Sequence, residues 1–184
     1  HRACGGTQRS RNPVPEVPAV SGTAGLRAAV ADTFAPGGPL ARTLSAFEAR
    51  EAQLQMADAV ARTLVKGGVL LAEAGTGTGK TLAYLIPAIL SRQRVLVSTG
   101  TKNLQEQIYF KDLPALRDAL GVPFTATYMK GRANYLCLHR FEQARAGSAV
   151  LPAEMAESLA DWVRTTETGD RAEIDDLPED SAVW

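Results

Sequence analysis

Cysteine is scarce in this chain of 184 residues, and long apolar runs are absent from it. The two cysteines, Cys4 and Cys137, are too few for a disulfide scaffold, so a reducing, cytoplasmic location is expected. No apolar run approaches the roughly 18 residues of a membrane span, so no membrane partner is expected. The sequence starts at His1 without a basic, apolar, small-residue leader, so no signal peptide is expected either.

Net charge is also absent, since 20 basic side chains balance 20 acidic ones, but the charges are unevenly spread. Residues 51–140 carry 11 bases and 6 acids, whereas residues 141–184 carry 3 bases and 11 acids. The basic stretch is suited to a polyanion, although solvated surface is the simpler explanation of such a split. The apolar share of 45% is enough to build a core and excludes a wholly disordered chain.

Apolar periodicity indicates an alternation of helices and strands. Residues 1–23 are rich in Gly, Pro, Ser and Arg and show no period, so a flexible tail is expected there. Helical periods cover residues 24–34, 48–66, 80–90, 101–110, 134–146 and 152–164. Short apolar runs predict buried strands at residues 69–72, 94–98 and 124–128. Strands alternating with helices favour an α/β fold, with a parallel sheet flanked by helices.

A glycine-rich loop between the first strand and the next helix is the strongest motif. It consists of Ala74, Gly75, Thr76, Gly77, Thr78, Gly79, Lys80 and Thr81. The glycines allow successive backbone N–H groups to face inward as an anion nest, and the following helix points its positive end at the same place. Lys80 would neutralise the β- and γ-phosphates, and the Thr81 hydroxyl would bind Mg²⁺. The loop therefore predicts a nucleoside triphosphate site with Lys80 and Thr81 as its catalytic residues.

Four segments in this order resemble the DinG/XPD group of superfamily 2 DNA helicases, and within it the bacterial DinG/YoaA branch. They are FAPGGPLARTLSAFEAREAQLQMADAV, LLAEAGTGTGKTLAYLIPAIL, VLVSTGTKNLQEQIYFKDLPAL and MKGRANYLCLHR. The resemblance implies a RecA-like P-loop lobe over residues 24–130 and the beginning of a helical iron–sulfur insertion over residues 131–184. It also implies a 5′→3′ helicase that uses ATP and Mg²⁺ on single-stranded or forked DNA, has a role in DNA repair and carries a 4Fe–4S cluster.

The resemblance assigns an adenine-recognition role to the segment just before the loop. Gln53 would read the adenine edge through an amide that donates and accepts together. Phe47 would stack on the base, and Arg50 would support the site. Without the resemblance, Gln53 reads as a solvated helix residue, because an isolated glutamine is usually exposed.

Two further segments resemble nucleic-acid contacts of the same group. Thr99, Thr101, Lys102 and Asn103 lie where the second predicted strand meets a helix, a position suited to backbone phosphates, although plain N-capping explains the threonines equally well. Lys130, Arg132 and Tyr135 offer charge and stacking to single-stranded DNA. Cys137 would be the first of four thiolate cluster ligands, and no cysteine follows it in the chain.

The sequence contains no Asp-Glu-x-His motif, and Asp175-Asp176 does not follow an apolar strand. Hydrolysis needs a carboxylate near the Mg²⁺. This chain is therefore expected to be a fragment that lacks the Walker B motif and the second helicase lobe. Such a fragment is expected to bind ATP but not to hydrolyse it. Two alternatives stay open: another P-loop class, such as a nucleotide kinase or switch protein, and a non-catalytic module that binds nucleotide or nucleic acid.

Overall fold

The computed structural model describes residues 22–45, 47–75, 77–148 and 153–174, and within them the chain forms two units with separate cores. The division between the units falls between Thr127 and Tyr128. The sequence places its boundary after residue 130, and the assignment of the second part to a cluster insertion stays a prediction.

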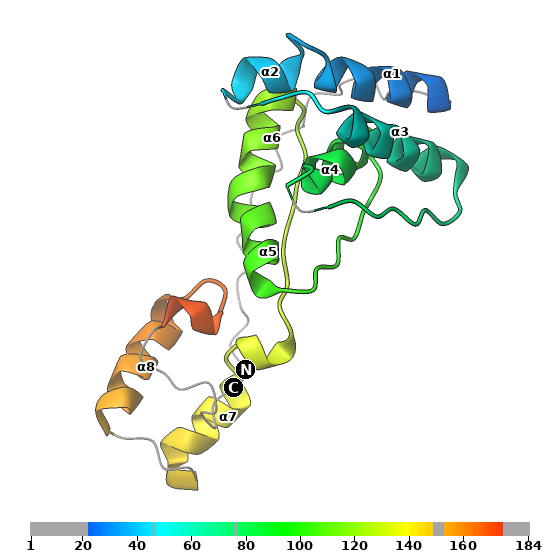
Figure 1. Ribbon diagram of the computed structural model, residues 1–184. Helices are drawn as coiled ribbons and strands as arrows, with labels where there is room; N and C mark the ends of the chain where they lie inside the picture. The colour runs from blue at the N-terminus through cyan, green and yellow to red at the C-terminus, as the bar shows by residue number, and fades with distance from the viewer. Residues whose placement is uncertain (1–21, 46, 76, 149–152, 175–184) are drawn as a thin grey trace. The chain divides into compact units, whose positions relative to one another are not determined.

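The first unit consists of helices joined by extended segments (Figure 1). Its helices are α1 (Gly22–Phe34), α2 (Pro39–Thr43), α3 (Glu51–Lys66), α4 (Lys80–Leu90), α5 (Lys102–Gln107), the π-helical turn η1 (Ile108–Asp112) and α6 (Leu113–Leu120). Helix α1 begins two residues earlier than the apolar period predicts. The rest of the predicted tail, up to residue 21, lies outside the described residues.

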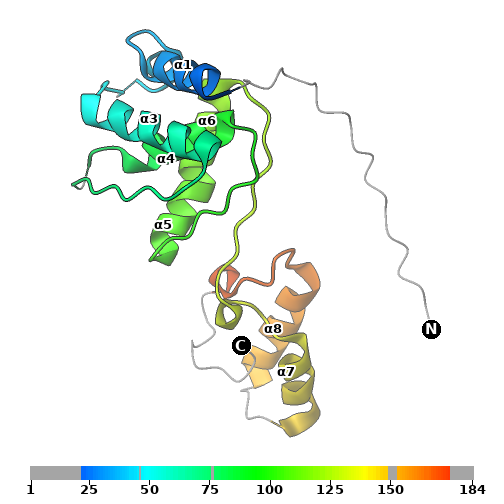
Figure 2. The same cartoon turned by 90° about the vertical axis from the view of Figure 1, so that its right-hand side faces the viewer.

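Helices α3 and α4 position the glycine-rich loop, which joins the extended segment after α3 to the start of α4. On α3, Ala57 and Ala61 are fully buried, as its apolar stripe predicts. Gly67 ends this helix with a φ of 76°, and its N–H donates to the Thr63 carbonyl at 2.8 Å. Helix α4 has the bounds that the sequence predicts. Figures 1 and 2 show α3 packed against both α1 and α4.

All the helices of the first unit contribute to its core except α5, which has no buried residue. The buried apolar residues are Leu26, Val30, Phe34, Leu40, Ala57, Ala61, Ala83, Leu85, Ile86, Ile108 and Leu116. The predicted helix over residues 101–110 is too short, because the helical path continues through η1 and α6 to Leu120. Pro114 is tolerated there because it lies in the first turn of α6. Gly121, with a φ of 60°, ends the helix.

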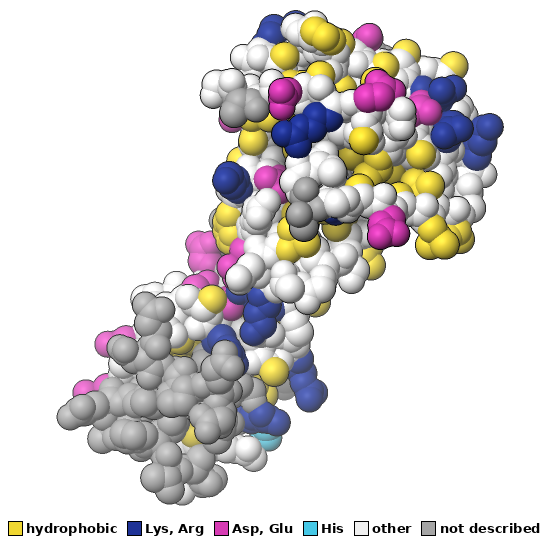
Figure 3. All heavy atoms as spheres, in the orientation of Figure 1, with side chains coloured by type: hydrophobic (Ala, Val, Ile, Leu, Met, Phe, Trp, Pro, Cys, Tyr) yellow, Lys and Arg dark blue, Asp and Glu magenta, His cyan; other side chains and the backbone are white. Residues whose placement is uncertain are grey.

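The parallel sheet is not confirmed. None of the three predicted strands belongs to a sheet in the part of the chain that the structure describes. Leu71 and Leu96 are 92% and 95% exposed, and apolar side chains reach the surface of this unit (Figure 3). Apolar runs become strands only where neighbouring backbone completes their hydrogen bonds, and these segments have no such neighbour among the described residues.

The second unit is smaller and also helical. It contains η2 (Arg132–Asn134), α7 (Leu138–Gln143), η3 (Ala144–Ser148), α8 (Ala153–Thr165) and η4 (Arg171–Glu173). Phe141, Ala144 and Leu159 form its buried core. The single helix predicted over residues 134–146 is instead divided, because residues 135–137 are extended and Tyr135 forms an antiparallel bridge with Asp170. Among the helices of both units, as far as they are described, none is long and apolar enough to cross a membrane.

Candidate nucleotide-binding site

The glycine-rich loop curls because two of its glycines adopt a left-handed backbone. Gly77 and Gly79 have φ values of 76° and 77°, which glycine adopts without the steric cost that a side chain would add. Gly79 is the N-cap of α4, so the backbone N–H groups at the start of this helix are available to an anion. Thr76 lies outside the described residues.

Lys80 lies over the loop. Its Nζ donates to the carbonyl oxygens of Ala74 and Gly75, each at 2.6 Å, and the Thr78 hydroxyl donates to Gly75 at 2.9 Å. The ammonium is therefore held by neutral carbonyls that an anionic phosphate would replace. Thr81 follows in the first turn of α4 and is half-buried, and its Mg²⁺ role stays a prediction.

Helix α3 and the residue before it hold the loop from the other side. The Gln53 amide nitrogen donates to the Gly79 carbonyl at 2.9 Å, and the Arg50 guanidinium donates to the Gly77 carbonyl. Gln53 is 5% exposed, so the alternative of a solvated helix residue is wrong. A Cβ at Gly79 would lie 2.1 Å from Gln53 Nε2, so a side chain at this position would displace the Gln53 amide from the loop.

These contacts refine the predicted role of Gln53. The sequence assigns both its donor and its acceptor to the base, whereas one N–H is directed to the loop. The amide keeps its carbonyl oxygen and a second N–H, and the carbonyl oxygen can accept a hydrogen bond from a base. Adenine presents a donor in its exocyclic amino group, which suits an acceptor at this point.

A hollow of about 310 Å³ lies beside the loop, at the lower end of the range of about 300–1,000 Å³ for ligand pockets. Its lining combines apolar side chains with loop residues: Leu44, Phe47, Glu48, Arg50, Gln53, Thr78, Gly79 and Leu82. The structure thus brings the three predicted adenine residues to the loop. Leu44, Glu48 and Leu82 lie within the segments that resemble known helicases, but the resemblance assigns no individual role to them.

The Ser98–Thr101 segment does act as a helix cap. Thr101 is the N-cap of α5 and accepts a hydrogen bond from the Leu104 N–H at 3.3 Å. The Thr99 hydroxyl donates to the Thr101 carbonyl at 3.1 Å. Lys102 and Asn103 are exposed at the start of the helix. The capping interpretation is therefore confirmed, and the nucleic-acid role of these residues stays a prediction.

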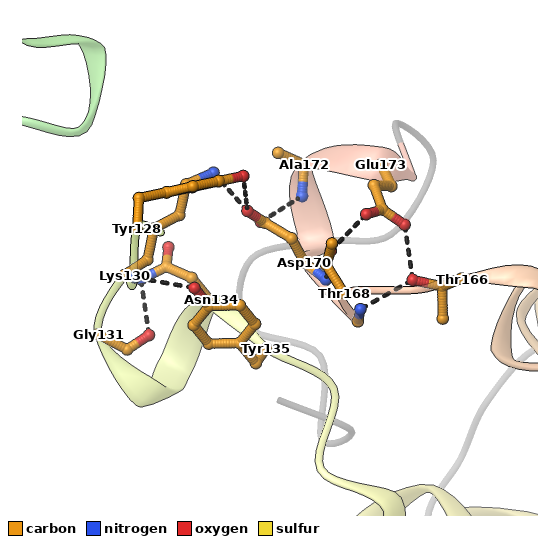
Figure 4. A network of polar contacts seen from close by, with 11 residues as sticks. Tyr128, Lys130, Gly131, Asn134, Tyr135, Thr166, Thr168, Asp170, Ala172 and Glu173 are labelled. Atoms are coloured by element: carbon orange, nitrogen blue, oxygen red, sulfur yellow. Dashed lines mark hydrogen bonds and ion pairs between the residues drawn. The ribbon is translucent and has the colours of Figure 1, made fainter. Parts of the chain in front are cut away.

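Lys130 is buried in the second unit rather than displayed to solvent (Figure 4). Its Nζ lies 2.6 Å from Asp170 Oδ2, and each side chain is 3% exposed. The Tyr128 hydroxyl donates to the same carboxylate oxygen at 3.4 Å, and the Lys130 N–H donates to the Tyr135 hydroxyl at 2.8 Å. Lys130 and Tyr135 thus belong to an internal network. Among the residues predicted to contact DNA in this unit, Arg132 is the exposed cation.

The network changes the acidity of Asp170. Burial alone would raise the pKa of this carboxyl, but the hydrogen bonds from Lys130 and Ala172 and the positive charge of Lys130 outweigh it. The pKa of Asp170 therefore lies below its ordinary value of 3.8. A carboxylate held in this way stays charged at neutral pH.

The predicted iron–sulfur role of Cys137 does not fit the residues present. Cys137 is a free thiol at the N-cap of α7, and no three His, Cys, Asp or Glu side chains gather as a metal site in the described parts of either unit. Cys4 lies outside the described residues. A 4Fe–4S cluster needs four ligands, so no step of the chemistry below involves one.

Comparisons with known proteins match this chain to helicases. Residues 51–137 match the DEAD/DEAH box helicase family. The chain is 44% identical over 156 residues to the ATP-dependent DNA helicase YoaA of Escherichia coli, an alignment that covers 83% of this chain and 24% of the relative. The Haemophilus influenzae YoaA is 42% identical, with 84% and 24% covered.

A third relative, the ATP-dependent helicase DinG of Mycobacterium tuberculosis, is 39% identical over 149 residues, covering 68% of this chain and 22% of the relative. The chain therefore spans about a quarter of the length of the curated relatives it matches. These matches show a DEAD/DEAH box helicase domain at residues 51–137 and a DinG/YoaA-like helicase sequence over most of the chain.

Proposed function

We propose that the chain binds ATP with Mg²⁺ as the nucleotide-binding part of an ATP-dependent DNA helicase. The observation that carries this proposal is the attachment of Gln53 and Arg50 to the loop carbonyls beside Lys80. Thr78 and Gly79 belong to the phosphate loop and also line the hollow in which the base would lie. The relatives named as ATP-dependent helicases support the choice of ATP as the nucleotide.

Different residues would bind the base, the phosphates and the Mg²⁺. Phe47 and Leu82 would cover the base, and Gln53 would select it. The nest of N–H groups and Lys80 would hold the β- and γ-phosphates. Mg²⁺, bound through the Thr81 hydroxyl, would neutralise phosphate charge. As the sequence predicts, this chain is expected to bind ATP without hydrolysing it.

Base selectivity tests the proposed role of Gln53. Wild type is expected to prefer ATP to GTP by about tenfold, because guanine presents an acceptor where adenine presents a donor to Gln53 Oε1. Gln53→Ala is expected to reduce this preference to about twofold and to weaken ATP binding, since the Gly79 carbonyl also loses its partner. Competition of ATP and GTP against a fluorescent nucleotide measures both effects.

Gln55→Ala is the matched control for this test. Gln55 lies on the same helix, is exposed, and bonds only to Glu51 at 3.0 Å among the contacts described. Its substitution is expected to leave both affinities unchanged. Equal binding of ATP and GTP by wild type would contradict the proposed base site.

We also propose that the whole protein translocates 5′→3′ on single-stranded or forked DNA in the cytoplasm and serves DNA repair. The support is that the YoaA relatives are named ATP-dependent DNA helicases and that this chain has exposed cations. Thr99, Thr101, Lys102 and Asn103 would hold backbone phosphates in the first unit, and Arg132 in the second. The cluster role of Cys137 stays a prediction for the whole protein.

The salt dependence of DNA binding tests this surface. Each neutralised phosphate adds about 0.7 to the slope of log affinity against log salt concentration on single strands. Lys102→Ala is expected to lower that slope by about this amount, whereas Lys66→Ala, at the exposed end of α3, is expected to leave it unchanged. Fluorescence anisotropy with a labelled oligonucleotide gives the slope. A slope near zero for wild type would contradict nucleic-acid binding.

A further inference from the structure

Phe34, the last residue of α1, lies against the predicted base-stacking residue. The ring centroids of Phe34 and Phe47 are 6.3 Å apart, and their planes are tilted by 47°. This separation is within the range of about 4.5–7 Å in which aromatic rings attract each other. Phe34 is 3% exposed and does not line the hollow beside the loop. Its ring contact with the lining of the hollow is the pair with Phe47.

Helix α1, which carries the Phe34 ring, is packed into the core of the first unit. Leu26 and Val30 are 1% and 0% exposed and belong to the core shared with α3 and α4. At the surface, Arg27 Nε lies 2.5 Å from Asp58 Oδ1 of α3. The helix thus holds Phe34 at a fixed place relative to α3, which also carries Gln53.

Phe47 has no comparable support from its own backbone. It lies in the extended segment between α2 and α3, where its N–H donates to the Leu44 carbonyl at 2.9 Å. One backbone hydrogen bond does not fix the rotamer of an aromatic ring, because χ1 and χ2 stay free to rotate. The ring contact with Phe34 restricts both angles while Phe47 lines the hollow.

We propose that Phe34 is a positioning residue for nucleotide recognition, which holds the Phe47 ring in the orientation that covers the base. This inference rests on the proposed ATP site and adds α1 to it as a functional element. The phosphate loop is attached separately, through Gln53 and Arg50. Removal of the Phe34 ring should therefore weaken binding of the base and leave binding of the phosphates unchanged.

The test compares ATP with inorganic tripolyphosphate, each with Mg²⁺, by calorimetric titration of the 184-residue chain. Phe34→Leu is expected to weaken ATP binding about threefold to tenfold, the range that the loss of an aromatic pair gives. Tripolyphosphate affinity is expected to stay within twofold of wild type, since this ligand has no base. The ratio of the two affinities is the readout, because a general loss of structure would reduce both.

Val30→Ala is the matched control, since Val30 is fully buried on the same helix and its ring-free side chain takes no part in the aromatic pair. It is expected to lower the melting temperature without changing the affinity ratio. Phe34→Tyr, which keeps the ring, is expected to retain the wild-type ratio. Should Phe34→Leu fail to fold, Phe34→Met, which also removes the ring and keeps an apolar side chain, takes its place with the same expected loss of ATP affinity.

One result would overturn the inference alone: an unchanged ratio of the two affinities in Phe34→Leu, whether both affinities stay at the wild-type value or fall together. A wild-type chain that binds tripolyphosphate but not ATP would overturn the base site and this inference with it. A wild-type chain that binds neither ligand would overturn the proposed function as a whole.

Discussion

Replacing Asp170 with alanine is expected to lower the free energy of unfolding of the second unit by about 3–5 kcal/mol, because the substitution leaves the Lys130 ammonium buried without its counter-charge. Both side chains are 3% exposed, so solvent does not compensate the loss. The same change removes the hydrogen bond from the Ala172 N–H to Asp170 Oδ1, which caps η4. Urea unfolding followed by tryptophan fluorescence measures the effect, because Trp162 lies on α8 of this unit and residues 1–127 contain no tryptophan.

Asp161→Ala is the control for that measurement. Asp161 also pairs with a base, Arg164, but the side chains are 74% and 71% exposed. Exposed pairs contribute about 0–1 kcal/mol, so only a small shift is expected. If Asp170→Ala shifts the unfolding curve no more than Asp161→Ala, the buried pair does not stabilise this unit.

The same pair predicts how stability responds to acid. Since the pKa of Asp170 is lower in the folded chain than its ordinary value of 3.8, its contribution is present above pH 3.8. That contribution is lost as the pH falls through the lower folded-state pKa. Asp170→Asn, which cannot ionise, is expected to remove this part of the pH dependence while keeping most of the side-chain volume.

The nucleotide site is predictable from the sequence because its signals are local. The glycine pattern before Lys80 fixes where α4 begins, and the apolar stripe of α3 with Gly67 fixes where that helix ends. The resemblance to known helicases adds Gln53 and Arg50, which the structure brings to the loop. Their partners, the carbonyls of Gly79 and Gly77, have no sequence signal, because every residue in a chain presents a backbone carbonyl.

The buried Lys130–Asp170 pair cannot be predicted from the sequence, for two physical reasons. Lysine is almost always exposed, so Lys130 next to Gly131 and Arg132 reads as a phosphate contact. Its partner lies 40 residues later, in an acidic stretch without periodicity. Long-range pairing of charges depends on the fold of the intervening chain, which here turns back so that the N–H of Leu136 donates to the Gly169 carbonyl at 2.9 Å.

The predicted strands have a strong local signal in the sequence, but this signal is not sufficient to form a sheet. The runs at residues 69–72 and 94–98 are apolar enough for a buried sheet, but Val69 is 89% exposed and Leu96 is 95% exposed. A strand is a property of at least two segments, and its hydrogen bonds need a partner in register. The helices form without a partner segment, because their backbone groups pair within one segment.

The largest expected effect on ligand binding follows from Lys80. Its ammonium is held by the Ala74 and Gly75 carbonyls at the mouth of the loop, where it would meet the β- and γ-phosphates. Hydrogen bonds to charged groups contribute about 1.5–3 kcal/mol each, so Lys80→Met is expected to weaken ATP binding roughly 10- to 100-fold. Lys66→Met, at the exposed end of α3, is expected to leave the affinity unchanged.

Calorimetric titration of the 184-residue chain with Mg²⁺-ATP is the most direct test that the glycine-rich loop is an ATP site. One molecule of ATP is expected to bind per wild-type chain, and Lys80→Met is expected to bind at least tenfold more weakly, while both proteins show the same melting temperature without nucleotide. Equal affinity of the two proteins for ATP, or no saturable binding of ATP by wild type, would contradict the assignment of the glycine-rich loop as an ATP site.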